Sequence, residues 1–144
     1  MTFNIEINKL VVIDDDPIHN FIAKKLIDKF QIANNLRIIS TVKEGIKFLE
    51  ERCIKKTEGI CPDIVLLDYH FPSMDAVEML EKVREMGLDM RNHIILIVIS
   101  ASVLKTEVQE KLRSLGTNGF LIKPINENDI KKVIEIYCTE KLPG

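Results

Sequence analysis

Five short apolar runs alternate with five amphipathic segments, and this alternation restricts the fold more than any other feature of the sequence. The runs are rich in Val, Ile and Leu, as are strands that are buried on both faces of a parallel sheet. They are Leu10–Ile13, Leu36–Ile39, Ile64–Leu67, Ile94–Ile99 and Phe120–Ile122. Right-handed βα crossovers between such strands predict an α/β fold, a doubly wound three-layer sandwich around a five-stranded parallel sheet.

The segments between these runs have the spacing of helices, with apolar residues three or four positions apart. Pro17 fits the first turn of the first helix, and Gly87 and Gly116 are suitable stops for the third and fourth. The apolar positions are Ile18, Ile22 and Leu26; Val42, Ile46, Leu49 and Cys53; Val77, Leu80 and Val83; Leu104, Val108, Leu112 and Leu115; and Ile130, Val133, Ile134 and Tyr137. We therefore expect a single domain over residues 1–144, with a core at about 9–138 and no output domain.

Charge and composition argue against several classes of protein. The net charge is −2 and neither half is markedly basic, so we expect no nucleic-acid partner. No apolar run has the length of a membrane span or a signal peptide, so we expect a cytoplasmic protein without a membrane partner. Cys53, Cys61 and Cys138 lack CxxC spacing and predict reduced thiols. His19 and His93 lack metal-ligand spacing and are expected to be ordinary surface or strand-edge residues.

Chemically reactive side chains follow four of the five predicted strands. Asp14–Asp16 follow the first strand, Asp68 the third, Ser100 the fourth and Lys123 the fifth. These groups should meet because the carboxyl ends of parallel strands share one edge of the sheet. Crowded carboxylates repel one another, and a hard cation such as Mg²⁺ relieves that repulsion. An aspartate beside Mg²⁺ can attack a phosphoryl group, while a lysine and a hydroxyl stabilise the phosphoryl oxygens.

Four stretches in this order resemble the receiver domain of two-component response regulators: LVVIDDDP, DIVLLDYHFPSMD, IVISAS and GFLIKP. The resemblance extends roughly from Lys9 to Cys138 and implies a stand-alone, CheY-like receiver. Its implied fold is the flavodoxin-like (βα)5 sandwich with strand order 2-1-3-4-5. Its implied function is phosphorelay signalling, in which a histidine kinase or a histidine phosphotransfer protein donates the phosphoryl group. Such a domain is not an enzyme in the usual sense, because it catalyses only its own phosphorylation and dephosphorylation.

The resemblance also implies a role for each residue of the predicted site. Asp68 is the phospho-acceptor and would carry the aspartyl phosphate. Asp14, Asp15, Asp68 and the backbone carbonyl of His70 would bind Mg²⁺. Lys123 would pair with the phosphoryl group.

Further residues would convert phosphorylation into a signal. Ser100 and Phe120 match the switch hydroxyl and the switch aromatic, which together change the surface of the fourth helix, fifth strand and fifth helix. The side chains of His70 and Ser102 would flank the path of the hydrolytic water and tune the phosphoryl lifetime. The signal would pass to a downstream protein target that the sequence does not identify. A cis peptide bond is common in the family before the proline that matches Pro124.

Other interpretations of the same residues remain open. Singly, the aspartates and Ser100 could cap helices, and Lys123 could be solvated. A degenerate receiver would act only as a protein-interaction module. A haloacid-dehalogenase-like phosphatase would use Asp14 and Asp16 as its Asp-x-Asp motif, but this chain has neither a cap nor a late acidic motif after Lys123. By resemblance, the start of the first helix, from Pro17 to Phe21, is the expected kinase-docking surface.

Overall fold

A computed structural model of the chain describes residues 7–92 and 94–141, in which five parallel strands alternate with five α-helices. The strands are β1 (Lys9–Ile13), β2 (Asn35–Ile39), β3 (Ile64–Asp68), β4 (Ile95–Ser100) and β5 (Thr117–Ile122). The helices are α1 (Pro17–Phe30), α2 (Val42–Leu49), α3 (Ala76–Glu85), α4 (Thr106–Ser114) and α5 (Glu127–Lys141). The strand order is β2-β1-β3-β4-β5, which confirms the predicted topology.

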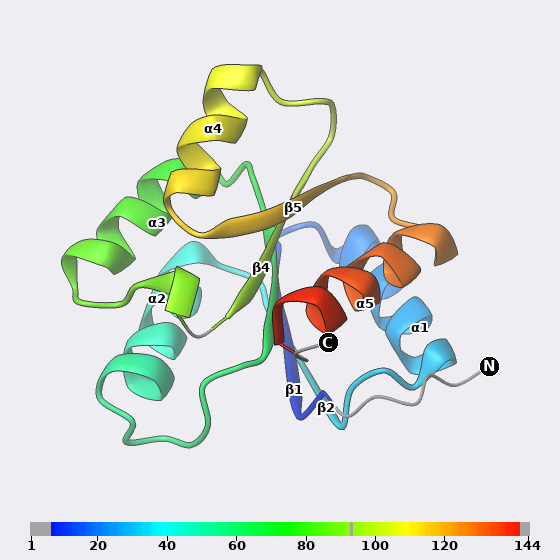
Figure 1. Cartoon of the computed structure of the whole chain (residues 1–144), viewed down its shortest axis with the longest axis horizontal. Helices are drawn as coiled ribbons and strands as arrows, with labels where there is room; N and C mark the ends of the chain where they lie inside the picture. The colour runs from blue at the N-terminus through cyan, green and yellow to red at the C-terminus, as the bar shows by residue number, and fades with distance from the viewer. Residues whose placement is uncertain (1–6, 93, 142–144) are drawn as a thin grey trace.

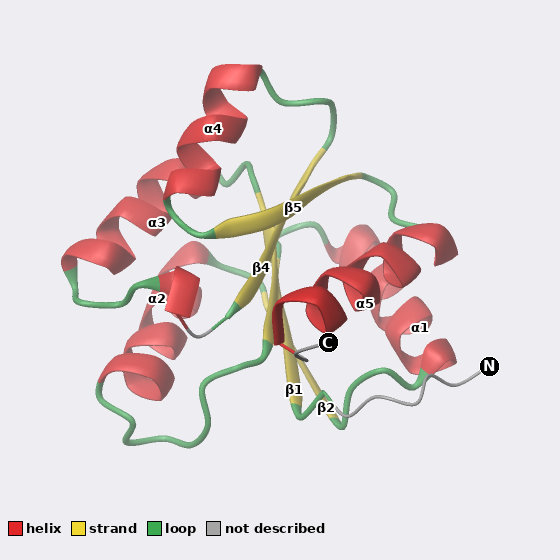
Figure 2. Ribbon diagram, in the orientation of Figure 1, coloured by secondary structure: helices red, strands yellow, loops and turns green. Residues whose placement is uncertain are grey.

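Helices cover both faces of the sheet and make three layers. Figures 1 and 2 show α2, α3 and α4 on one face and α1 and α5 on the other. Successive strand residues point to opposite layers, as the pleat requires. Val11 and Ile13 pack in the layer of α2, α3 and α4, while Leu10 and Val12 pack in the layer of α1 and α5. All residues of β3 and β4 are buried, which explains why these strands are the most apolar runs in the sequence.

Caps and glycines fix where the helices begin and end. The side chain of Asp16 accepts hydrogen bonds from two backbone N–H groups at the start of α1, and Thr41 caps α2 in the same way. Asp75 forms a reciprocal capping box at the start of α3. The predicted stops at Gly87 and Gly116 are confirmed, since their φ angles of 106° and 109° favour glycine.

The second predicted helix changes its winding before it ends. Its α-helical part stops at Leu49, and Glu50–Ile54 continue as a π-helical turn, in which the N–H of Lys55 bonds the carbonyl of Glu50 at 2.8 Å. The fourth helix is shorter than predicted, because Leu104 lies in the preceding loop. The fifth strand is longer and begins at Thr117, which pairs with β4.

Cys53 and Cys61 form a disulfide, with Cα atoms 4.8 Å apart. The prediction of three reduced thiols is therefore wrong for this pair, and Cys138 alone of the three is a free thiol. The separation of eight residues gave no pairing signal in the sequence. The chain reverses after the π-helical turn and brings the two side chains together. No helix within the described ranges is long and apolar enough to cross a membrane.

Candidate functional site

Three carboxylates meet at the carboxyl edge of the sheet. Asp14 and Asp15 directly follow β1, and Asp68 is the last residue of the neighbouring strand β3. One carboxylate oxygen from each residue lies within 4.8 Å of the others. Asp14 and Asp68 are buried, with 1% and 5% of their surfaces exposed, whereas Asp15 is open to solvent. The structure thus brings together the three side chains that the sequence predicted as metal ligands.

Lys123 supplies the positive charge of this cluster from the end of β5. Its Nζ lies 3.0 Å from Asp14 Oδ2, 3.4 Å from Asp68 Oδ2 and 3.9 Å from Asp16 Oδ2. Its backbone N–H donates to the carbonyl of Ser100 at 2.9 Å, and the following peptide bond to Pro124 is cis, as predicted. Burial lowers the pKa of Lys123, but its carboxylate partners outweigh burial and raise the pKa above its ordinary value.

The two buried aspartates have opposite electrostatic environments. Burial and the negative charge of Asp14 raise the pKa of Asp68 from 3.8 to about 6, although Lys123 and the N–H of His70 favour its ionised form. Burial alone would also raise the pKa of Asp14, but hydrogen bonds from His19, the N–H of Asp16 and Lys123 outweigh it and lower the pKa below the ordinary value. Asp14 is therefore held as a carboxylate, while Asp68 is the less stabilised anion of the pair.

His19 is a site residue that the sequence interpretation missed. It is 2% exposed, and its Nδ1 lies 2.9 Å from Asp14 Oδ2, so the prediction of a surface or strand-edge histidine is wrong. Its neighbour Asn20 donates from Nδ2 to the backbone carbonyl of Asp14 at 2.8 Å. Residue types and spacing gave no signal for this contact, because it depends on where the N-cap Asp16 starts α1 and so on the direction in which the imidazole points. His93 lies outside the described residues.

The predicted switch and lifetime residues surround the acidic cluster. Ser100 ends β4, is 7% exposed, and donates its hydroxyl hydrogen to the backbone carbonyl of Ser102, whose own side chain is exposed. Phe120 on β5 is half-buried against the layer of α2, α3 and α4, and the guanidinium carbon of Arg113 lies 5.0 Å from its ring centroid. His70 is exposed, and its N–H donates to Asp68 Oδ1 at 3.4 Å.

The donor set of the cluster suits a hard divalent cation. Its ligands are carboxylate oxygens, and burial together with the charge of Asp14 raises the pKa of Asp68, so a bound cation would favour the ionised form of Asp68. Asp15 faces solvent and gives an ion a path of entry. Mg²⁺ fits this arrangement, since it binds through few carboxylates and retains several waters.

Comparison with known proteins identifies the family. The sequence model of the response regulator receiver domain matches residues 10–135, and the chain belongs to this family. Receiver domains are signalling domains of two-component systems and not enzymes in the usual sense. The matched range includes the acidic cluster, Ser100 and Lys123.

Individual relatives agree with this assignment. The nitrate/nitrite response regulator protein NarL of Escherichia coli (strain K12) is 30% identical over 131 residues, 91% of this chain and 55% of NarL. Chemotaxis protein CheY of Treponema pallidum is 26% identical over 129 residues, 88% of this chain and 78% of CheY. The chain thus spans about half the length of the first curated relatives it matches. A two-component response regulator from Cytophaga hutchinsonii has the same fold, with a TM-score of 0.81 at 21% identity over 94% of this chain and all of that one.

Proposed function

We propose that this receiver accepts a phosphoryl group on Asp68 in a Mg²⁺-dependent phosphorelay. The observation that carries the proposal is the position of Lys123, whose ammonium lies within 3.4 Å of Asp68 and 3.0 Å of Asp14 at one edge of the sheet. If these residues served only as helix caps, Lys123 would not need to lie between the buried carboxylates of Asp14 and Asp68. The three residues come from the ends of three different strands. Only Asp16 acts as a helix cap in this group.

The transfer would start from a phosphohistidine on a kinase or a phosphotransfer protein. An Asp68 oxygen attacks phosphorus, the phosphorus–nitrogen bond breaks, and the electron pair leaves with the donor imidazole, which takes up a proton. Asp14, Asp15, Asp68 and the carbonyl of His70 would hold Mg²⁺, which supplies positive charge to the phosphoryl oxygens when bound. Lys123 lies close enough to Asp68 to stabilise the same oxygens. With a pKa of about 6, Asp68 is largely ionised at neutral pH and can act as the nucleophile.

The output would follow from Ser100 and Phe120. Ser100 bonds its neighbouring loop through Ser102, and a phosphoryl group on Asp68 offers the hydroxyl a charged acceptor instead. Movement of Ser100 opens space for Phe120 to turn inward, away from Arg113. This shift would change the α4–β5–α5 surface that a downstream protein reads. The exposed side chains of His70 and Ser102 would tune the phosphoryl lifetime.

The phosphodonor would dock at the start of α1. Ile18 and Phe21 expose 72% and 62% of their surfaces there, which is unusual for large apolar side chains that lie close together. Pro124 and Ile125 line neighbouring hollows on the same side of the molecule. We do not expect nucleic acid or membrane among the partners. A cytoplasmic location and a single-domain extent over residues 1–144 remain predictions. The Cys53–Cys61 disulfide removes the support that three reduced cysteines would have given to a cytoplasmic location.

The experiment is phosphorylation by acetyl phosphate, followed by intact mass. Wild-type protein with Mg²⁺ should gain one phosphoryl group, and the gain should disappear with EDTA or in Asp68→Asn. Retained phosphorylation of Asp68→Asn would place the acceptor elsewhere. Absence of an adduct on the wild type, with acetyl phosphate and with a competent kinase, would favour a degenerate interaction module.

A further inference from the structure

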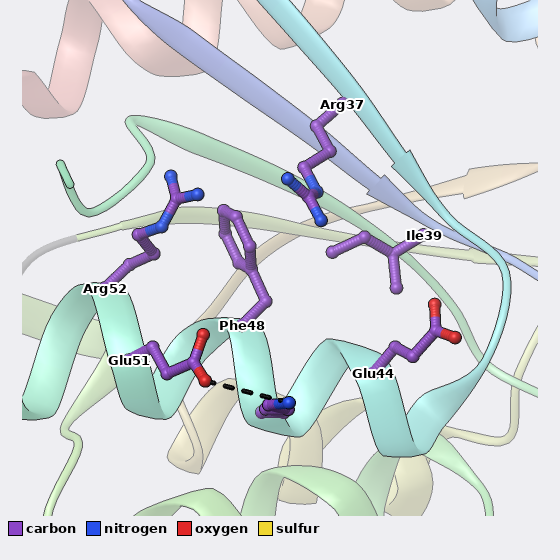
Figure 3. Close-up of a pocket in the computed structure, with 7 residues that line it drawn as sticks. Arg37, Ile39, Glu44, Phe48, Glu51 and Arg52 are labelled. Atoms are coloured by element: carbon purple, nitrogen blue, oxygen red, sulfur yellow. Dashed lines mark ion pairs between the residues drawn. The ribbon is translucent and has the colours of Figure 1, made fainter. Parts of the chain in front are cut away.

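Three cations from three elements surround one buried aromatic ring on the α2 side of the sheet. Lys9 of β1, Arg37 of β2 and Arg52 of the π-helical turn lie 5.7, 5.3 and 4.7 Å from the ring centroid of Phe48. Phe48 itself is 5% exposed. Figure 3 shows Arg37 and Arg52 on either side of this ring. These three side chains line a hollow of about 300 Å³. We call Lys9, Arg37, Arg52 and Phe48 the Phe48 cluster.

The positive charges of the Phe48 cluster have no acidic partner within the described part of the chain. Ion pairs do join several other surface lysines to nearby carboxylates, such as Lys24 to Asp28. Burial lowers the pKa of Lys9, and the charges of Arg52 and Arg37 lower it further, so the three cations repel one another. The hollow contains two glutamates, but Glu51 pairs with Lys47, and Glu44 lies at the far end from Arg52.

The Phe48 cluster adjoins an open sheet edge. β2 pairs only with β1, so among the described residues its outer N–H and C=O groups face no strand. Arg37 is exposed in the middle of β2, on the face that α2 covers. A strand added beside β2 would place alternate side chains on this face, within reach of Arg37 and Arg52. Phe48 cannot serve as a stacking surface for a flat ligand, because the cations already cover its ring.

We propose that the β2 edge and the Phe48 cluster bind an extended acidic segment of a partner protein. The segment would pair with the backbone of β2, and carboxylates at alternate positions would bond Arg37 and Arg52, whose planar forks match carboxylate geometry. The surface is separate from the acidic site. Arg37 pairs in register with Val11, three residues before Asp14, and β1 separates β2 from the strand β3 that carries Asp68. Binding here leaves Asp68 accessible.

The test uses the whole chain and a labelled peptide of about seven residues in which Glu alternates with Thr. Fluorescence polarisation should detect binding that weakens about tenfold or more in the double variant Arg37→Gln/Arg52→Gln. The matched variant Lys82→Gln/Arg84→Gln removes the same charge from the exposed face of α3 and should bind as the wild type does. A peptide with Gln for Glu, and one with methylated backbone nitrogens, should each bind more weakly.

A second measurement does not depend on how the variants fold. In wild-type protein, the peptide should shift the amide resonances of residues 35–39, 48 and 52 and leave residue 68 unaffected.

Equal losses of peptide affinity in both double variants would refute the proposal, because net charge alone would then explain binding. Self-association of Arg37→Gln/Arg52→Gln with unchanged peptide affinity would also refute it, because the arginines would then only protect the edge. Displacement of the peptide by an equal concentration of inorganic phosphate would also refute the proposal, because the surface would then bind anions in general. Phosphorylation by acetyl phosphate should be the same in all variants, so a failure of this inference is distinguishable from a failure of the acceptor chemistry.

Discussion

Replacement of the acceptor by its neutral isostere should stabilise the fold. Asp68 is 5% exposed, and its pKa is raised to about 6 by burial and by the charge of Asp14. An ordinary aspartate in the unfolded chain has a pKa of 3.8. Between these values the folded protein binds more protons than the unfolded chain, so stability falls as the pH rises. Asp68→Asn keeps the shape of the side chain and removes this loss.

The magnitude follows from the two pKa values. The difference of about 2 pH units corresponds to roughly 3 kcal/mol, since one unit is worth about 1.4 kcal/mol. Asp68→Asn should therefore be more stable than the wild type by up to about 3 kcal/mol near pH 7.5, and by only about 1 kcal/mol near pH 4.5. The sign is unusual, because most substitutions of buried polar residues destabilise a protein.

Urea unfolding followed by far-ultraviolet circular dichroism measures the difference, and it suits a chain without tryptophan. The exposed Asp28→Asn is the matched control and should change the free energy of unfolding by less than about 1 kcal/mol at either pH. Equal stability of Asp68→Asn and wild type near pH 7.5, or a gap that does not shrink in acid, would refute the electrostatic account of the site.

Three further changes test the interactions that support the acidic site and the fold. His19→Leu should weaken Mg²⁺ binding about tenfold, measured by calorimetry, because Asp14 loses a hydrogen bond. His19→Asn should bind Mg²⁺ with much of the wild-type affinity, since its amide nitrogen can replace Nδ1. Lys123→Met should lower the free energy of unfolding in EDTA by about 1–3 kcal/mol, and Mg²⁺ should recover part of the loss in urea titrations. Reduction of the Cys53–Cys61 disulfide should lower the free energy of unfolding by about 2–3 kcal/mol, as the length of the loop that it closes predicts. Unfolding with and without a reductant measures this loss, and Cys138→Ser should leave the free energy of unfolding unchanged.

The sequence predicted the sheet and most of the site for identifiable physical reasons. β3 and β4 are fully buried, and their uninterrupted apolar residues signal this directly. Asp14 and Asp68 could be expected to meet because each follows a strand of the same parallel sheet. Lys123 lies far from both along the chain, but the same rule of strand ends placed it beside them.

Features that depend on side-chain direction were beyond sequence reasoning. His19 looks like a surface helix residue until the cap at Asp16 fixes the start of α1 and turns the imidazole toward Asp14. The Cys53–Cys61 bond depends on a π-helical turn and a reversal that leave no periodic signal. The Phe48 cluster joins residues of four elements beside an edge strand whose position only the topology defines.

Chemical mapping of the phosphorylated residue tests the central claim most directly. Protein treated with acetyl phosphate and Mg²⁺ is reduced with borohydride, which converts an aspartyl phosphate to homoserine, and the modified peptide is sequenced by mass spectrometry. We predict homoserine at position 68 alone, and none without Mg²⁺. Homoserine at Asp14 or Asp15, or modification that persists in EDTA, would contradict the proposal that Asp68 is the metal-dependent acceptor.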